Sequence, residues 1–231
     1  MKSFLSSLAA ILTLAAAMAL ASPPSPRSLV PADESRLRPG HKIPTGPEGQ
    51  PALALIEGHP YPLVRVGAQT WLGENLLVRR DERGQELSDV LLENADPKSA
   101  GRGNLYTWDA ARRAVPAGWR LPTVKDWQAL IGLLGGERAA GRALLRTGPG
   151  GFGALLGGGV DVLGRAFAQK EQAIFWTSAE ISVDRAVCLT IDRGGEIELG
   201  PRPKTSRLPV RLIRDDPEFA ALTPPSESRR P

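Results

Sequence analysis

The chain has 231 residues, 42% of them hydrophobic and 23% charged, with a formal net charge of +4. This is enough chain and apolar content for one domain with a real core. The 29 basic and 25 acidic residues nearly balance, and no dense Lys/Arg run carries interleaved aromatics, so nucleic-acid binding is not expected. The single cysteine, Cys188, rules out a disulfide within the chain and lies in a strand pattern, where we expect a packed side chain rather than a nucleophile.

The N-terminus has the order of features of a secretory signal peptide. Lys2 precedes an apolar run from Phe4 to Leu20, and Ala19-Leu20-Ala21 is a small-residue cleavage site. Serine and threonine residues interrupt the run, which is shorter than the roughly 20 apolar residues of a membrane anchor. We therefore predict a signal peptide over residues 1–21, cleaved after Ala21, and a secreted or periplasmic protein without a stable membrane span. An uncleaved anchor helix is the alternative.

The segments on either side of the central region have little to bury. Residues 22–51 are rich in Pro, Ser, Gly and charge, and residues 215–231 are similar. Such segments cannot offset the entropy lost on ordering. We expect a disordered Pro-rich leader over 22–51, an ordered domain over 52–214 and a flexible tail over 215–231.

The first half of the domain predicts a hairpin, a loop and one helix. Apolar residues on either side of Gly67-Ala68 favour a β-hairpin over residues 61–72. Residues 79–103 are polar and indicate a long surface loop. A helix capped by Thr107 follows, with Trp108 on its apolar face, and Pro116 ends it.

The second helix has the clearest signals. Thr123 is a natural N-cap, and Asp126, three residues later, can reach back as a shortened capping box. Trp127, Leu130, Ile131 and Leu134 fall on one helical stripe, and two glycines follow. A weaker helix is predicted over residues 137–146.

The β pattern returns after a glycine-rich segment at residues 148–159, which lacks the spacing of a phosphate-binding loop. We predict strands at 174–177, at 186–191 and 196–199 around the turn 192–195, and at 208–214. Strands, then helices, then strands predict an α+β fold with an antiparallel sheet and two main helices. The first and last strands should be neighbours, so that Val64 and Val210 share a sheet.

Several motifs occur in a fixed order between Tyr61 and Arg214: Gln69-Thr-Trp-Leu-Gly-Glu-Asn-Leu76, Gly103-Asn-Leu-Tyr-Thr-Trp108, Pro116-Ala-Gly-Trp-Arg-Leu-Pro122, Phe175-Trp-Thr-Ser-Ala-Glu180 and Val210-Arg211. In this order the chain resembles the Fibrobacter succinogenes major paralogous domain. The resemblance implies an exported protein of unknown biochemical function with a C-type-lectin-like fold, distantly similar to sulfatase-modifying-factor domains. Many members of that family carry two cysteines where this chain has Val115 and Leu212, and we expect these two side chains to pack together instead.

No catalytic set emerges from the residue pattern. His41 and His59 are the only histidines and lack metal-ligand spacing, and no Gly-x-Ser-x-Gly motif occurs. The carboxylates Glu74, Asp126, Glu180 and Asp192 cannot be placed at a glycosidase separation from sequence. We therefore expect neither a metal nor another cofactor.

We expect one of the five tryptophans to contact a ligand. Four should be core, and Trp176, near the loop-rich region, should be accessible. The predicted binding residues are Trp176, Glu180, Arg185 and Asp192. The expected function is a non-catalytic binding or surface-interaction module for an extracellular glycan or protein. A sulfatase-modifying-factor-like enzyme and a structural envelope protein remain open.

Overall fold

The computed structural model describes residues 52–92, 101–146 and 151–215. The predicted signal peptide, leader and most of the tail lie outside these residues, as do 93–100 of the predicted surface loop and 148–150 of the glycine-rich segment. Asp215, which we assigned to the tail, is the last residue of a strand. None of the helices in the described ranges has the length and apolar character needed to cross a membrane.

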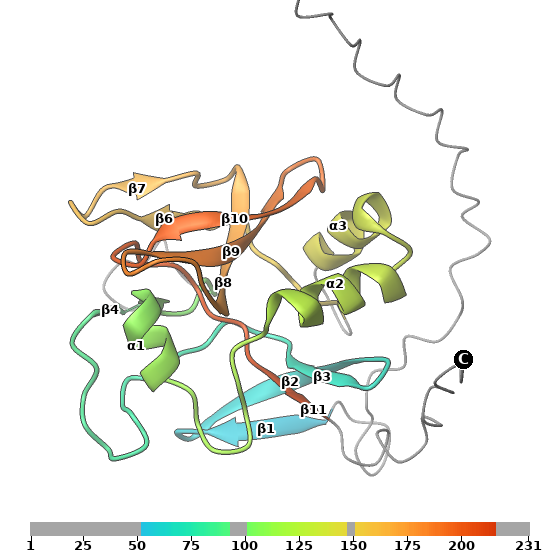
Figure 1. Ribbon diagram of the computed structural model, residues 1–231. Helices are drawn as coiled ribbons and strands as arrows, with labels where there is room; N and C mark the ends of the chain where they lie inside the picture. The colour runs from blue at the N-terminus through green and yellow to red at the C-terminus, as the bar shows by residue number, and fades with distance from the viewer. Residues whose placement is uncertain (1–51, 93–100, 147–150, 216–231) are drawn as a thin grey trace, which may run out of the picture. The chain divides into compact units, whose positions relative to one another are not determined.

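Antiparallel strands and three helices make up the described chain, in the predicted α+β order (Figure 1). One sheet has the order β1 (Leu53–Ile56), β2 (His59–Val66), β3 (Gln69–Leu72), β11 (Ile213–Asp215). A second has the order β10 (Ile197–Pro203), β9 (Arg185–Asp192), β8 (Gln172–Glu180). Two short pairs join β4 (Val90–Leu91) to β5 (Leu105–Tyr106) and β6 (Gly159–Val160) to β7 (Ala166–Phe167). The helices are α1 (Trp108–Arg113), α2 (Val124–Leu133) and α3 (Glu137–Leu145).

Local sequence signals place the first hairpin and the helix starts as predicted. Val66 pairs with Gln69 across the turn, where Gly67 has a φ of 59° that a side chain would disfavour. The hydroxyl of Thr107 accepts from the Ala110 amide at the start of α1. At α2 the capping box is complete: Thr123 accepts from the Asp126 amide at 3.1 Å, and the Asp126 carboxylate accepts from the Thr123 amide at 2.6 Å.

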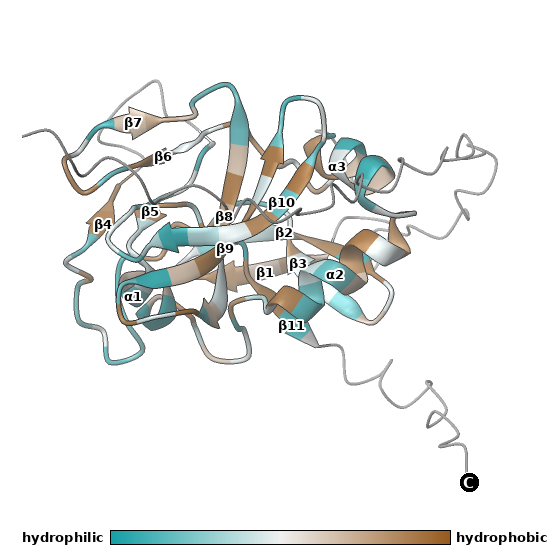
Figure 2. Cartoon of the chain, turned by 45° about the horizontal axis from the view of Figure 1, so that its top comes forward, coloured by the Kyte–Doolittle hydropathy of each residue, from teal (hydrophilic) through white to brown (hydrophobic). Residues whose placement is uncertain are grey.

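Both faces of the central strands are buried, which divides the core into two clusters. On β8, Ile174 and Trp176 belong to one cluster, and Ala173 and Phe175 belong to the other. Successive side chains of a strand point to opposite faces, so a strand covered on both sides has an unbroken apolar sequence. The second cluster lies against α2, whose apolar and polar residues alternate around the helix (Figure 2).

The closing segment joins the first hairpin, but through a shorter strand than predicted. Val64 and Ile213 both pair with Trp71, so β3 lies between β2 and β11. Val210 is outside any strand, and its carbonyl accepts from the Leu76 amide at 2.9 Å. The prediction of one strand over 208–214 was therefore wrong, because the backbone of this segment bonds in turn to several different segments instead of one neighbouring strand.

Residues 207–213, which we call the closing segment, bond through their backbone to six other parts of the chain. Its backbone partners, from Arg207 to Ile213, are Val160, Tyr106, Trp176, Leu76, Leu72 and Arg120. The closing segment thus lies at the centre of the domain. Leu212 is a buried member of one core cluster, and Val115 packs against the same cluster from a partly buried position. Direct packing of Val115 on Leu212 stays a prediction.

Candidate functional site

Trp176 is not the accessible tryptophan that we predicted. Its side chain is fully buried, and its indole N–H donates to the Tyr106 carbonyl at 2.8 Å. The physical reason is the two-sided burial of β8, which leaves no free face for the ring. Trp71, Trp108 and Trp127 are also buried, which leaves Trp119 as the partly exposed tryptophan.

The other three predicted binding residues do not converge on one site. Glu180 pairs with Ala186 at one end of the β8–β9 ladder, and Asp192 pairs with Gln172 at the other. Six residues of strand separate these ends, or roughly 20 Å. Glu180 forms an ion pair with Lys204, and the Asp192 carboxylate accepts from the Glu196 amide at 2.7 Å in the β9–β10 turn. Arg185 is exposed beside Asp184. Each of the two carboxylates has a local structural partner.

A hollow of about 750 Å³ opens instead between α1, the loop that follows β3 and the α1–α2 connection. We call it the arginine hollow because four arginines line it: Arg83, Arg112, Arg113 and Arg120. Its other lining residues are Asp81, Glu82, Val115, Leu121, Thr123 and Ser178. It therefore combines the apolar side chains of Val115 and Leu121 with fixed charge, as ligand sites commonly do.

Two of the four arginines are already neutralised. Arg113 lies 3.6 Å from the Asp81 carboxylate, and Arg120 makes two hydrogen bonds to Asp126. Backbone hydrogen bonds from Gln85 and Arg83, together with Arg113, hold the pKa of Asp81 below its usual value. Arg83 and Arg112 are exposed and have no carboxylate within ion-pairing distance in the described parts of the chain. These two cations are therefore available to a ligand.

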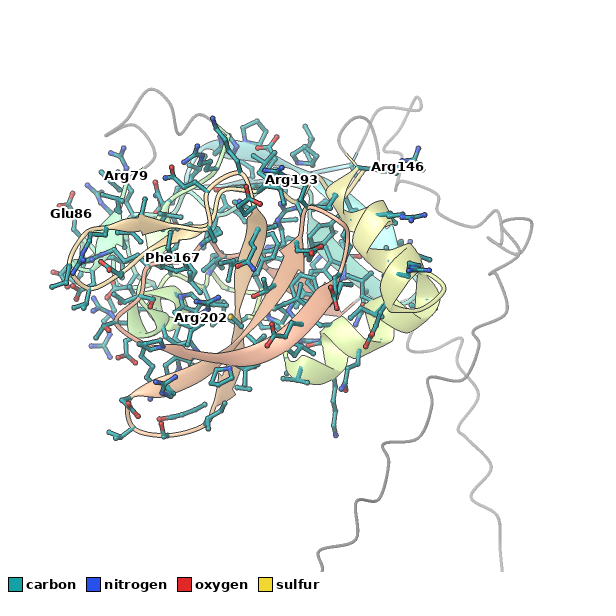
Figure 3. The ribbon with its side chains drawn as sticks, turned by 90° about the horizontal axis from the view of Figure 1, so that it is seen from above. Arg79, Glu86, Arg146, Phe167, Arg193 and Arg202 are labelled. Carbon is teal, nitrogen blue, oxygen red and sulfur yellow. The ribbon has the colours of Figure 1, made fainter. Side chains whose placement is uncertain are left out.

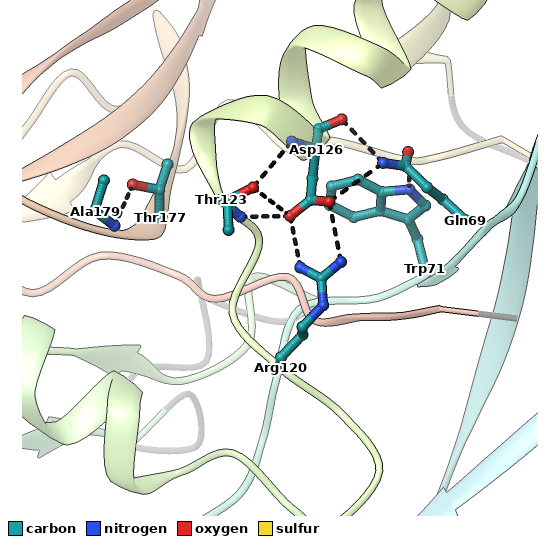
Figure 4. A network of polar contacts seen from close by, with 7 residues as sticks. All are labelled: Gln69, Trp71, Arg120, Thr123, Asp126, Thr177 and Ala179. Atoms are coloured by element: carbon teal, nitrogen blue, oxygen red, sulfur yellow. Dashed lines mark hydrogen bonds and ion pairs between the residues drawn. The ribbon is translucent and has the colours of Figure 1, made fainter. Parts of the chain in front are cut away.

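The Asp126 carboxylate binds two residues that line the hollow, Arg120 and Thr123 (Figure 4). It accepts from Arg120 at 2.5 and 3.0 Å, from the Thr123 hydroxyl at 2.7 Å and from the Thr123 amide. Burial alone would raise the pKa of Asp126, but the hydrogen bonds from Arg120 and Thr123 outweigh it and lower the pKa. The carboxylate stays ionised at neutral pH and fixes α2 to the segment before it.

A second hollow, of about 570 Å³, adjoins the first. We call it the tryptophan hollow because Trp119 lines it, with Val78, Ala114 and Pro116 among its apolar residues. Asp81, Glu82 and Val115 line both hollows. The Arg214 guanidinium lies 5.1 Å from the centre of the Trp119 ring and holds it in place. Sequence reasoning missed Trp119, although a tryptophan after Pro116-Ala-Gly118, outside both predicted helices, was a signal for exposure.

The buried titratable groups outside the hollows are structural. Burial raises the pKa of the Cys188 thiol, which lies 3.6 Å from the Gly200 carbonyl oxygen. On neighbouring β10, Arg202 covers the Phe167 ring at 5.2 Å (Figure 3). In residues 52–92, 101–146 and 151–215, no three His, Cys, Asp or Glu side chains lie close enough together to hold a metal ion.

Arg211 is the one charged residue among the largest fully buried side chains of the described chain. Its guanidinium donates to Asn75 Oδ1 and to the carbonyls of Leu72 and Phe152, and it lies 4.5 Å from the Phe152 ring centre. Burial lowers the pKa of Arg211 to about 9, so the group still carries its charge at neutral pH. It is enclosed by protein and belongs to the structural core of the domain.

Comparison with known families places these features in context. Residues 64–214 match the family model of the Fibrobacter succinogenes major domain. The chain belongs to this family. Every residue that lines the arginine hollow of this Fibrobacter major domain lies within the matched region. Strand β1, which contributes Leu55 and Ile56 to the tryptophan hollow, precedes the matched region. No curated protein and no solved structure matches the chain.

Proposed function

We propose that this chain is an exported, non-catalytic binding module for an extracellular glycan or protein, and that the arginine hollow is its binding site. The observation that carries the proposal is an open hollow of about 750 Å³ lined by apolar side chains and by two arginines that have no ion-pair partner in the described chain. Export rests on the signal-peptide pattern of residues 1–21. The family resemblance supports a C-type-lectin-like fold, in which ligands bind at a loop-rich surface.

The state of the carboxylates in and beside the hollow favours binding over catalysis. A general acid at neutral pH needs a raised pKa, whereas the pKa values of Asp81 and Asp126 are lowered. Both groups are also occupied by hydrogen bonds from their neighbours. The Cys188 thiol is buried, and its raised pKa keeps it protonated, which makes it a poor nucleophile.

A substitution that fills the hollow tests the proposal. Ser178 is exposed, lines the hollow and bonds to Pro122 only through its backbone amide, so Ser178→Trp should fill the site without disturbing the core. Gln128→Trp, at an exposed position of α2 outside the hollow, is the matched control.

The mature domain is first screened on an array of cell-wall glycans and in a pull-down with extracellular proteins. The proposal expects a ligand whose binding is abolished by Ser178→Trp and retained by Gln128→Trp. Folded protein that finds no ligand in either screen, or a ligand that Ser178→Trp still binds, would contradict it.

A further inference from the structure

We infer that the ligand of the arginine hollow is an acidic polysaccharide, whose carboxylate or sulfate groups bind Arg83 and Arg112 while a sugar ring contacts Trp119. This inference rests on the proposed function and names the ligand class for the same site. Three features carry it: the distribution of free charge, the position of the accessible indole and the continuity of the two hollows.

The internal ion pairs of the hollow leave part of its positive charge unpaired. Arg113 and Arg120 are held by Asp81 and Asp126, which leaves Arg83 and Arg112 facing a ligand. An exposed guanidinium binds a carboxylate or a sulfate with two parallel N–H groups, a geometry that a neutral sugar hydroxyl does not match.

Arg112 is also held in position. Its guanidinium lies 4.8 Å from the centre of the buried Trp108 ring, and Lys204 lies 4.6 Å from the same ring. A cation fixed against an aromatic ring loses less conformational freedom when it binds an anion. Arg112 is therefore a preorganised anion contact, whereas Arg83 stands on the exposed loop after β3.

The tryptophan hollow adds a contact that is suited to a sugar ring. Trp119 is partly exposed beside the apolar surface of Val78, Ala114 and Pro116. Aromatic side chains with one polar edge pack against the apolar C–H face of a pyranose. Because the two hollows share Asp81, Glu82 and Val115, a chain of sugar units can contact the indole in one hollow and the arginines in the other.

Glu82 lines the hollow with a charge that opposes an acidic ligand, so replacing it should raise the affinity that the arginine substitutions lower. Glu82 is exposed, lines both hollows and has no basic partner within the described ranges. Its negative charge repels an acidic ligand. Glu82→Gln should therefore strengthen binding of a polyanion and leave binding of a neutral glycan unchanged.

The experiment uses calorimetric titration of the mature chain with four probes: oligogalacturonate, dextran sulfate, neutral dextran of matched length and poly-L-glutamate. We expect binding of at least one acidic polysaccharide and none of neutral dextran. Arg83→Gln and Arg112→Gln should each weaken this binding about tenfold, the loss of one charged hydrogen-bonding contact, and Glu82→Gln should strengthen it. The control Arg138→Gln/Arg142→Gln, altered at two exposed positions of α3, removes the same charge as the double variant Arg83→Gln/Arg112→Gln and should bind normally.

The outcomes separate the two claims. Binding of neutral dextran or another neutral glycan that Ser178→Trp blocks and the arginine variants leave unchanged would overturn the acidic ligand but keep the binding module. Tighter binding of poly-L-glutamate than of either acidic polysaccharide would overturn the inference in favour of an acidic protein. Folded protein that binds none of the four probes would overturn the acidic-polysaccharide ligand, whereas the binding module itself falls only if the glycan array and the pull-down also find no ligand. Thermal midpoints within the range of the unsubstituted chain show that each variant is folded.

Discussion

The guanidinium of Arg211 holds the side-chain oxygen of Asn75 with two N–H groups, Nε at 3.1 Å and Nη2 at 2.7 Å, across 136 residues of sequence. Its Nη1 donates to the carbonyls of Leu72 and Phe152. Arg211 thereby joins the end of the first hairpin, the segment after α3 and the closing segment. In a chain with one cysteine, this buried set of hydrogen bonds and the packing around it close the domain without a covalent link.

Replacing Arg211 should therefore be among the most destabilising single changes. Arg211→Met leaves the oxygens of Asn75, Leu72 and Phe152 without their donor in a buried site, and we expect a loss of about 3 kcal/mol or more in the free energy of unfolding. Urea denaturation measures it, with Arg138→Met at an exposed position as the control. A loss below about 1 kcal/mol would show that Arg211 is not needed for closure.

Two helical glycines should respond to alanine with opposite signs. A Cβ at Gly141 in α3 would overlap the backbone of Gly195, whereas a Cβ at Gly132 in α2 would meet nothing within 4 Å. Gly132→Ala should raise the free energy of unfolding by about 0.5–1 kcal/mol, because alanine is the better helix former. Gly141→Ala should lower it, because α3 must move away from the β9–β10 turn. Equal thermal shifts in the two variants would refute the close approach of α3 to that turn.

The buried tryptophans should differ in what their indole nitrogen contributes. Trp176 donates to the Tyr106 carbonyl, while the Nε1 of the buried Trp127 has no acceptor in the described parts of the domain. Both Trp→Phe changes remove similar volume, but only Trp176→Phe removes a hydrogen bond. We expect Trp176→Phe to cost about 1 kcal/mol more in chemical denaturation. A larger loss for Trp127→Phe would mean that its N–H has a partner in solution.

The Asp126 carboxylate should make the stability of the domain depend on acid pH. Because its folded pKa lies below the ordinary value of 3.8, the ionised form stabilises the fold above that pH, and this contribution is lost as the pH falls through the folded pKa. Asp126→Asn should cost about 1 kcal/mol at pH 7, mainly through the Arg120 contacts. Its difference from the unsubstituted chain should shrink below pH 3.8. A difference that stays constant from pH 7 to pH 3 would contradict the assigned role.

Local signals predicted the parts of the fold that depend on neighbouring residues. Thr123 and Asp126 identify the start of α2 because a capping box needs only a three-residue spacing. The turn at Gly67 is likewise a local property. The order of strands and helices followed from such elements taken together.

The candidate site could not be predicted in the same way, because exposure depends on what covers each face. An apolar run such as residues 173–176 is typical of a strand buried on both sides, yet we expected Trp176 at the surface. The course of residues 207–213 depends on six separate backbone partners, which no single pattern in the segment specifies. The arginine hollow brings together Arg83, Arg112, Arg120 and Ser178 from distant parts of the sequence.

The central claim is that ligand binds in the two adjoining hollows, and the indole resonances of the ¹⁵N-labelled protein test it most directly. Of the five tryptophans, Trp119 is the partly exposed one and lines a hollow, whereas Trp71, Trp127 and Trp176 are fully buried. On titration with oligogalacturonate, the Nε1–H signal of Trp119 should shift most, and those of the three buried rings should stay in place. Saturable binding that leaves the Trp119 signal unmoved would contradict the account.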